Sequence, residues 1–353
     1  MARAIGKHAA HKAEAGAILI AVPALQVIGG LGLLLIGGEV LLRGAVALAQ
    51  RFGLSHLLIG LTVVAAATSM PELVVTVASG LRGLPDIGVG NVIGSNIANI
   101  LLILGAAALL FPIQTKPAEM LRDSAAVLAA TVIFMLFALL GPITWVHGVA
   151  MLALLVVYVG YSYALERRRN NNARSEAAAA AARTAAATAT PDVPEIEVPS
   201  SCGLALLLVG GGVIGLVIGS ELLVGGAAAI ARAAGVSDAV IGLTLVAVGT
   251  SLPELATSIV ASMRHHSEVA LGNVLGSNLF NILGVLAALA ITTPFSVAPE
   301  MLQVDIWVMA AAALLLVPIM MTGWRVGRLE GTAFLLLYGA YVAWQFYRMP
   351  VAG

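Results

Sequence analysis

Long apolar blocks separated by short polar segments run through almost the whole chain. Ten of them are long enough to cross the ~30 Å hydrocarbon layer of a bilayer, which takes about 20 helical residues. They cover residues 17–50, 57–80, 86–111, 120–141, 143–165, 203–232, 239–262, 268–293, 301–322 and 329–348. The weak alternation typical of membrane β-barrel strands is missing from the sequence, so the pattern favours helices. We therefore expect an all-α polytopic membrane protein with ten transmembrane helices.

The composition agrees with this prediction and excludes several functions. Hydrophobic residues make up 60% of the chain and charged residues 10%, against about 45–50% and about 25% in a soluble domain. Because 18 basic residues balance 18 acidic ones, no net charge favours nucleic acid as a partner. The single cysteine, Cys202, rules out an internal disulfide, and the scattered histidines indicate neither a zinc nor a redox cluster. No span pairs a serine with a His or Lys base, so we expect neither an enzyme nor a resident cofactor.

The second half of the sequence repeats the first at an offset of 182 residues. The matched polar segments and residues are Thr68–Glu72 with Thr250–Glu254, Gly90–Asn96 with Gly272–Asn278, Glu39 with Glu221, Asn99 with Asn281, and Asp123 with Asp305. Shared membrane composition cannot produce polar matches in one register. Each copy holds five spans, an odd number, so the second copy enters the bilayer upside down. The pattern predicts two inverted five-helix repeats, as in secondary transporters.

The repeat also predicts the boundaries of the chain's segments. We expect an N-terminal tail over residues 1–16, the first repeat over 17–165, a linker over 166–201 and the second repeat over 202–353. The linker combines arginines, an alanine tract and three prolines, which is typical of a tether. In this topology twelve of the 18 basic residues lie on the linker side. That distribution favours a cytoplasmic linker.

Two acidic residues, Glu72 and Glu254, lie inside apolar blocks. Translocon scales assign such a residue about 2.5–3.5 kcal/mol at the centre of a span, so a functional role is the default interpretation. The alternative is a structural carboxylate bonded to a neighbouring helix, which the duplication makes less attractive. Pro71 and Pro253 precede the two glutamates and remove a backbone donor, so we expect each helix to break there. A helix broken at membrane depth is tolerated where it lines a cavity.

Hydroxyl and amide groups accompany the two glutamates at helical spacing. Thr68 and Ser69 lie four and three residues before Glu72, which places the three side chains on one face. The polar residues expected at the site with the glutamates are Thr68, Ser69, Ser95, Asn99, Thr250, Ser251, Ser277 and Asn281. A set made only of oxygen donors suits Ca²⁺ or Na⁺ better than Mg²⁺. Helix packing is the alternative interpretation for the hydroxyls and for the Gly-x-x-x-Gly spacings at 90, 94, 272 and 276.

The paired motifs Gly-Leu-Thr-x₅-Thr-Ser-x-Pro-Glu-Leu and Gly-Asn-Val-x-Gly-Ser-Asn resemble those of the calcium/cation antiporter superfamily, specifically its prokaryotic sodium/calcium exchangers. The resemblance covers nearly the whole chain except the N-terminal tail and the linker. It implies a central cation site built from the second, third, seventh and eighth spans and opened alternately by sliding of the first and sixth. It names Glu72 and Glu254 as the main carboxylate ligands, with the eight polar residues above. It adds the backbone carbonyls of Ala65 and Ala247.

Two departures from the family pattern bear on the ions. The first repeat has Ala67 where the second has the usual Gly249, which affects how sharply that helix breaks. Many sodium/calcium exchangers carry an aspartate at the position of Asn281, so this chain would have two central carboxylates rather than three. Neither Gly-Asn motif contains the acid typical of the proton/calcium branch, which favours sodium as the counter-ion.

The resulting hypothesis is a secondary active antiporter that exchanges Ca²⁺ for Na⁺ by alternating access at a site between the repeats. Proton- or potassium-coupled cation antiport remains open, as does a passive cation channel. Glu39 precedes Arg43 by four residues, so we interpret it as part of an ordinary helix ion pair outside the site. Short loops without an N-glycosylation sequon favour a multi-pass protein of a prokaryotic inner membrane.

Overall fold

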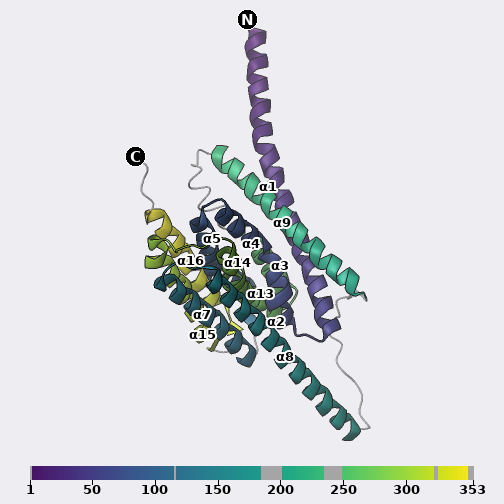
Figure 1. Cartoon of the computed structure of the whole chain (residues 1–353). Helices are drawn as coiled ribbons and strands as arrows, with labels where there is room; N and C mark the ends of the chain where they lie inside the picture. Colours follow the sequence, from purple (N-terminus) through teal and green to yellow (C-terminus); the bar gives the residue numbers. More distant parts are fainter. Residues whose placement is uncertain (1, 115–116, 184–200, 234–248, 322–324, 349–353) are drawn as a thin grey trace.

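Helices make up almost all of the described chain (Figure 1). The computed structural model describes residues 2–114, 117–183, 201–233, 249–321 and 325–348. The helices of the first half, with η marking π-helical turns, are α1 (Ala2–Phe52), α2 (His56–Ile59), η1 (Gly60–Val64), α3 (Ala65–Thr68), α4 (Met70–Leu81), α5 (Pro85–Ala98), η2 (Asn99–Leu104), α6 (Gly105–Leu110), α7 (Pro117–Leu140) and α8 (Trp145–Arg183). Those of the second half are α9 (Cys202–Ala233), α12 (Leu252–Met263), α13 (Ser267–Phe280), η4 (Asn281–Val285), α14 (Leu286–Thr292), η5 (Met301–Asp305), α15 (Ile306–Met321) and α16 (Arg328–Arg348).

Several of these helices are long and apolar enough to cross a membrane. Within the described ranges there are six: Ala21–Phe52, Pro85–Leu110, Glu119–Leu140, Trp145–Arg169, Cys202–Ala233 and Ser267–Thr292. The pair His56–Thr68 and Met70–Leu81, bent by 44°, makes a seventh if it counts as one span. The expectation of an all-helical multi-pass membrane protein is confirmed. The predicted block 239–262 lies partly on residues 234–248, which are outside the described chain.

Helices α1 and α9 pack against each other along the side of the remaining helices (Figure 1). Their contact is made backbone to backbone: an added Cβ at Gly37 would lie 2.8 Å from the Leu216 nitrogen, and one at Gly219 would lie 2.9 Å from the Leu34 nitrogen. The contact glycines recur every seven residues, at 30, 37 and 44 on α1 and at 212, 219 and 226 on α9. Small residues allow this close approach in a membrane. The two stripes are equivalent at the offset of 182.

The other helices surround a hydrophobic core that both halves share. Val89 and Ile97 of α5 pack there with Leu279 of α13 and Ile282 of η4, and all four are fully buried. Two short backbone pairings also join the halves. Strand β1 (Ile113–Gln114) pairs antiparallel with β2 (Arg325–Val326), and an isolated bridge joins Ile143 to Phe295. The repeated motifs on α4, α5, α12 and α13 are thereby packed into one body.

Two helices extend beyond their predicted apolar blocks. Helix α1 begins at Ala2, ahead of the predicted start at residue 17. Helix α8 continues to Arg183, so its last 18 residues fall in the segment interpreted as a tether. The end of the membrane part of α8 is tied to the start of α2, because Glu166 accepts hydrogen bonds from the backbone N–H and the hydroxyl of Ser55, the residue before α2. This contact marks the face of the bundle from which the linker leaves.

Candidate cation-binding site

The two predicted helix breaks flank the candidate site. Helix α3 ends at Thr68, and α4 begins at Met70 with Pro71 in its first turn. In the second half α12 begins at Leu252 with Pro253 in its first turn. The serine at each break has nearly the same backbone conformation, with φ −83° and ψ 9° at Ser69, and φ −89° and ψ 5° at Ser251. Each break places a glutamate in the first turn of the helix that follows.

Glu72 and Glu254 are both completely buried, and each is bonded by the serine of the opposite half. The Ser69 hydroxyl donates to Glu254 Oε1 at 2.9 Å, and the Ser251 hydroxyl lies 3.4 Å from Glu72 Oε1. The second serine also lies 3.3 Å from the hydroxyl oxygen of Ser95 on α5. The crosswise bonds bring the two helix breaks together, so each carboxylate lies at the contact between the two halves.

A second pair of crosswise bonds surrounds the first. The Thr68 hydroxyl donates to Asn273 Oδ1 on α13 at 3.1 Å. At the equivalent place the Thr250 hydroxyl donates to Asn91 Oδ1 on α5 at 3.3 Å. The amide of Asn273 also donates to the backbone carbonyl of Glu254 at 3.3 Å. The asparagines therefore hold the helix breaks in register with the glutamates.

Asn91 and Asn273 were not among the predicted site residues, although both stand in the repeated Gly-Asn-Val motif. Each also donates to a hydroxyl on the helix that follows a break. Asn91 Nδ2 lies 3.2 Å from Thr76 Oγ1, and Asn273 Nδ2 lies 3.0 Å from Ser258 Oγ. At the offset of 182, Asn91 corresponds to Asn273 and Thr76 to Ser258. A search for every duplicated polar residue, rather than for cation ligands, would have found them.

The amides of Asn99 and Asn281 lie at the start of π-helical turns. Turn η2 begins at Asn99 and η4 at Asn281. Turns of this kind add a residue within a helix and often occur at functional sites. Asn99 Nδ2 donates to Asn278 Oδ1 at 3.2 Å. Each π-helical turn shifts the helical register after the Gly-Ser-Asn segment. A regular 3.6-residue spacing does not predict this shift.

Several buried oxygens at the site have no hydrogen-bond partner among the described residues. They are Glu72 Oε2, Glu254 Oε2, Asn99 Oδ1, Asn281 Oδ1 and Ser277 Oγ. Buried polar atoms are usually paired, because desolvation costs about 1–3 kcal/mol for each unpaired group. Four of the five form equivalent pairs in the two repeats, Glu72 with Glu254 and Asn99 with Asn281. Carboxylate, amide and hydroxyl oxygens of this kind are the donors that a hard cation takes. The part of the chain that the structure describes shows no cluster of three or more His, Cys, Asp or Glu side chains.

The remaining predicted ligands are backbone carbonyls. The Ala65 carbonyl accepts the Ser69 N–H at 3.0 Å and the Thr68 hydroxyl at 3.3 Å. It lies at the first break, beside residues that bond the second half. Ala247 falls in the segment 234–248 and is outside the described residues.

Two buried carboxylates among hydroxyl and amide oxygens, inside a multi-pass helical protein with two matching halves, are typical of a cation transporter. The model of the sodium/calcium exchanger protein family matches residues 22–164 and 204–347, one stretch in each half. The chain is 32% identical over 349 residues to the sodium/calcium exchanger MaX1 of Methanosarcina acetivorans, covering 93% of this chain and 100% of that one. It is 32% identical over 318 residues to the inner membrane protein YrbG of Escherichia coli, covering 89% and 93%.

A solved structure has the same fold. It is the sodium-calcium exchanger NCX_Mj soaked with 2.5 mM Na⁺ and 0.1 mM Ca²⁺, which aligns with a TM-score of 0.73 at 31% identity over 91% of this chain and 97% of that one. The chain belongs to the sodium/calcium exchanger family. It is accordingly a cation antiporter of the membrane and not an enzyme, and the resemblance inferred from the motifs is confirmed.

Proposed function

We propose that the protein exchanges Ca²⁺ for Na⁺ by alternating access at one central site. The crosswise bonds from Ser69 to Glu254 and from Ser251 to Glu72 carry this proposal. Each carboxylate is bonded by a serine of the opposite half, so a movement of one half against the other reorients both carboxylates together. A site built this way can face either side of the membrane without being taken apart.

The proposed ligands are the residues named from the sequence. They are Glu72 and Glu254 with Thr68, Ser69, Ser95, Asn99, Thr250, Ser251, Ser277 and Asn281, completed by the carbonyls of Ala65 and Ala247. Ca²⁺ neutralises the two carboxylates, whereas Na⁺ ions compete for the same oxygens. Two uncompensated carboxylates in a low dielectric are costly to occlude. The site therefore crosses the membrane only when it is loaded, and loading by one ion excludes the other.

The proposed architecture is ten transmembrane helices in two inverted repeats, residues 17–165 and 202–353, joined by a cytoplasmic linker over 166–201. Paired contacts at the offset of 182 support it. The pairing of Ile113 with Val326 and the bridge between Phe295 and Ile143 use equivalent connections of the two halves. The glycine stripes of α1 and α9 are equivalent in the same way. The inner-membrane location is proposed by analogy with YrbG.

Uptake of ⁴⁵Ca²⁺ into proteoliposomes tests the proposed exchange. Vesicles are loaded with Na⁺, K⁺ or choline at equal internal and external pH, and a fourth set carries a pH gradient without Na⁺. We expect uptake from Na⁺-loaded vesicles only, and none in Glu72→Gln or Glu254→Gln. Glu300→Gln removes an exposed carboxylate elsewhere and serves as the matched control with normal uptake. Uptake driven by internal K⁺ or by the pH gradient would identify K⁺ or H⁺, rather than Na⁺, as the counter-ion. Rapid uptake that needs no internal cation would indicate a channel.

A further inference from the structure

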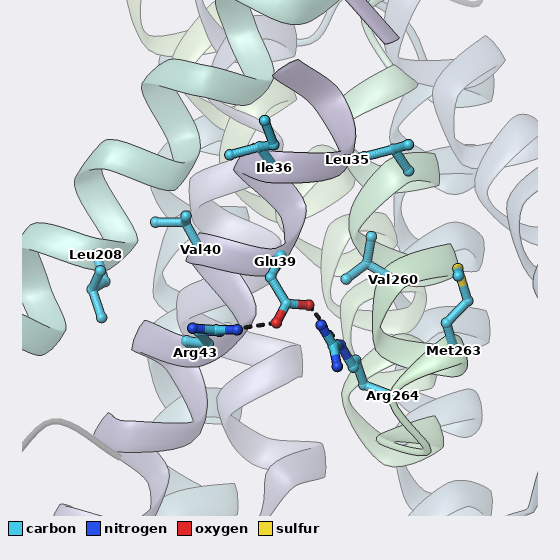
Figure 2. A pocket seen from close by; sticks show the side chains of 9 residues that line it. All are labelled: Leu35, Ile36, Glu39, Val40, Arg43, Leu208, Val260, Met263 and Arg264. Carbon is cyan, nitrogen blue, oxygen red and sulfur yellow. Dashed lines mark hydrogen bonds and ion pairs between the residues drawn. The ribbon is translucent and has the colours of Figure 1, made fainter. Parts of the chain in front are cut away.

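An ion pair joins α1 to the end of α12 outside the cation site. Arg264, the residue after α12, donates from Nε to Glu39 Oε2 at 2.8 Å. Arg43 donates from Nε to the other oxygen, Oε1, at 2.9 Å. Figure 2 shows Glu39 between the two arginines, beside a groove of about 570 Å³ whose other lining residues are apolar. The expected pair within α1 is thus present, and the structure adds a bond between two helices.

The residues of this interhelical pair are duplicated, and Arg43 is not. At the offset of 182, Glu39 corresponds to Glu221 on α9, and Arg264 corresponds to Arg82, the residue after α4. Arg43 corresponds to Gly225. Both halves thus carry the glutamate and the arginine of the pair between helices, whereas only the first half carries the arginine of the pair within one helix. No ion pair joins Arg82 to Glu221, both of which belong to the described chain, and both residues are exposed.

The helix packing beside the two pairs also differs: it is close where the ion pair is formed and open where it is not. Helix α1 packs along α12, and a Cβ added at Gly38 would lie 3.3 Å from Val260 Cγ2. Ala256 on that face of α12 is 8% exposed, whereas its equivalent on α4, Val74, is 63% exposed. Helix α9 makes no comparable contact with α4; Ser220, the equivalent of Gly38, instead donates to the carbonyl of Gly249. Helix α12, which carries Glu254, is therefore covered by α1, whereas the equivalent face of α4, which carries Glu72, is exposed.

The two pairs belong to opposite faces of the bundle. Arg264 lies near the linker face, because the ring of His266 contacts that of His56 at 5.0 Å and the adjoining Ser55 bonds Glu166. Helix α4 continues the segment that starts at His56, so Arg82 at its end lies at the other face. The covered side of the structure is consequently the linker side, and the open side is the opposite one.

We propose that Glu39–Arg264 and Glu221–Arg82 are alternating ion pairs, each of which holds one access state of the transporter. In the state described here α1 is held against α12, and the linker face is closed. When the repeats exchange conformations, α9 moves onto the exposed face of α4, the pair of Glu221 with Arg82 forms and the pair of Glu39 with Arg264 breaks. The inference rests on the alternating access of the proposed function, and it assigns a role to residues outside the cation site.

Disulfide trapping with two matched reporters tests the alternation. Cys202→Ser first removes the single native thiol. Gly38→Cys with Val260→Cys reports contact of α1 with α12, and the equivalent Ser220→Cys with Ala78→Cys reports contact of α9 with α4. A Cβ added at Gly38 would lie 3.3 Å from Val260 Cγ2, the atom bonded to the Val260 Cβ, so the thiols of the first pair come within reach of each other. Both reporters leave all four charged residues in place. Full-length protein in vesicles is oxidised briefly at several ratios of Na⁺ to Ca²⁺.

We expect both disulfides to form, in proportions that change oppositely with the ions. Glu39→Gln or Arg264→Gln should lower the first relative to the second roughly two- to fivefold, the effect of a partly exposed ion pair. Glu221→Gln or Arg82→Gln should shift the ratio the other way. Arg43→Gln is the matched control and should leave it unchanged. The exchange of charges in Glu39→Arg with Arg264→Glu should restore the ratio, which a general loss of stability would not do.

Three results would overturn the proposal: a second disulfide that never forms, an Arg43→Gln variant that shifts the ratio as much as Arg264→Gln, or a charge exchange that fails to restore it. Uptake of ⁴⁵Ca²⁺ in the same vesicles separates this failure from failure of the proposed function. Sodium-driven uptake with an unresponsive disulfide ratio refutes the ion pairs alone. Alternating disulfides without sodium-driven uptake refute the proposed ions and support the ion pairs.

Discussion

Substituting Gly276 by alanine should disturb the proposed cation site through helix packing alone. Gly276 lies on α13, where an added Cβ would be 2.6 Å from the Leu61 Cα and 2.7 Å from the Ala65 Cβ, and closer still to the Leu61 carbonyl oxygen. These atoms belong to the backbone or to its first side-chain carbon, so no flexible side chain can move aside. Helix α13 must then shift away from η1 and α3 by somewhat less than ~1 Å to restore ordinary contact distances.

The shift has a cost that can be worked from the structure. Overpacking a tight contact by one methyl group typically costs about 1–3 kcal/mol. The same movement pulls Asn273 away from the Thr68 hydroxyl, now at 3.1 Å, and an unmade buried hydrogen bond adds about 1–3 kcal/mol. We expect the free energy of unfolding to fall by roughly 2–4 kcal/mol, since the two effects overlap. Ca²⁺ affinity should fall as well, because Ser277 moves with α13.

Thermal unfolding in detergent, with EDTA and with Ca²⁺, measures the first effect, and equilibrium binding of ⁴⁵Ca²⁺ measures the second. Gly160→Ala is the matched control, because Gly160 is exposed on α8 and an added Cβ meets no atom within 4 Å. A Gly276→Ala protein that melts with this control and binds Ca²⁺ like the wild type would refute the reasoning about helix contact.

Three further predictions follow from the site and its surroundings. Thr68→Val leaves Asn273 Oδ1 without the donor that it has now, and should lower the free energy of unfolding by about 1–3 kcal/mol; Thr68→Ser should lower it less, and equal melting temperatures would contradict this. Burial lowers the pKa of His266 from its ordinary 6.5, so the unfolded chain binds more protons below that pH, and stability should fall as the pH drops from 7 to 5. His266→Gln should reduce this fall, and His265→Asn, at an exposed position, should not. Melting temperatures that depend on pH equally in His266→Gln and the wild type would refute the assignment to His266. Asn281→Asp puts a third carboxylate where neither amide atom is paired, so the protein should melt lower in EDTA and gain more than the wild type from Ca²⁺, whereas an unchanged gain would place residue 281 away from the cation.

Much of the candidate site stands out in the sequence, because its residues are chemically unusual for their surroundings. A glutamate in an apolar span is costly unless it is used, and the proline before it predicts where the helix breaks. The duplication of Glu72 as Glu254 then brings two such points together. Asn91 and Asn273 were missed because an amide in a glycine-rich motif has several uses, and only the fold shows that each one bonds the opposite half.

The difference between the two halves could not be predicted from the sequence. Equivalent motifs give no reason for Val74 to be exposed and Ala256 buried. In the proposed alternating access, this asymmetry belongs to one conformational state rather than to the residues. The ion pair of Glu39 with Arg264 is of the same kind. Sequence spacing correctly predicted the pair of Glu39 with Arg43, since both lie on one helix. It could not predict the partner on another helix, whose distance depends on how the halves are placed.

The central claim is that Glu72 and Glu254 form a single cation site shared by the two halves. Equilibrium binding of ⁴⁵Ca²⁺ to purified protein, with increasing Na⁺, tests it most directly. We predict one Ca²⁺ per chain, displaced by Na⁺ but not by choline, and loss of that binding in both Glu72→Gln and Glu254→Gln. A variant with either glutamate replaced that still binds one Ca²⁺ with wild-type affinity, or a wild type that binds two independent Ca²⁺ ions, would contradict the shared site.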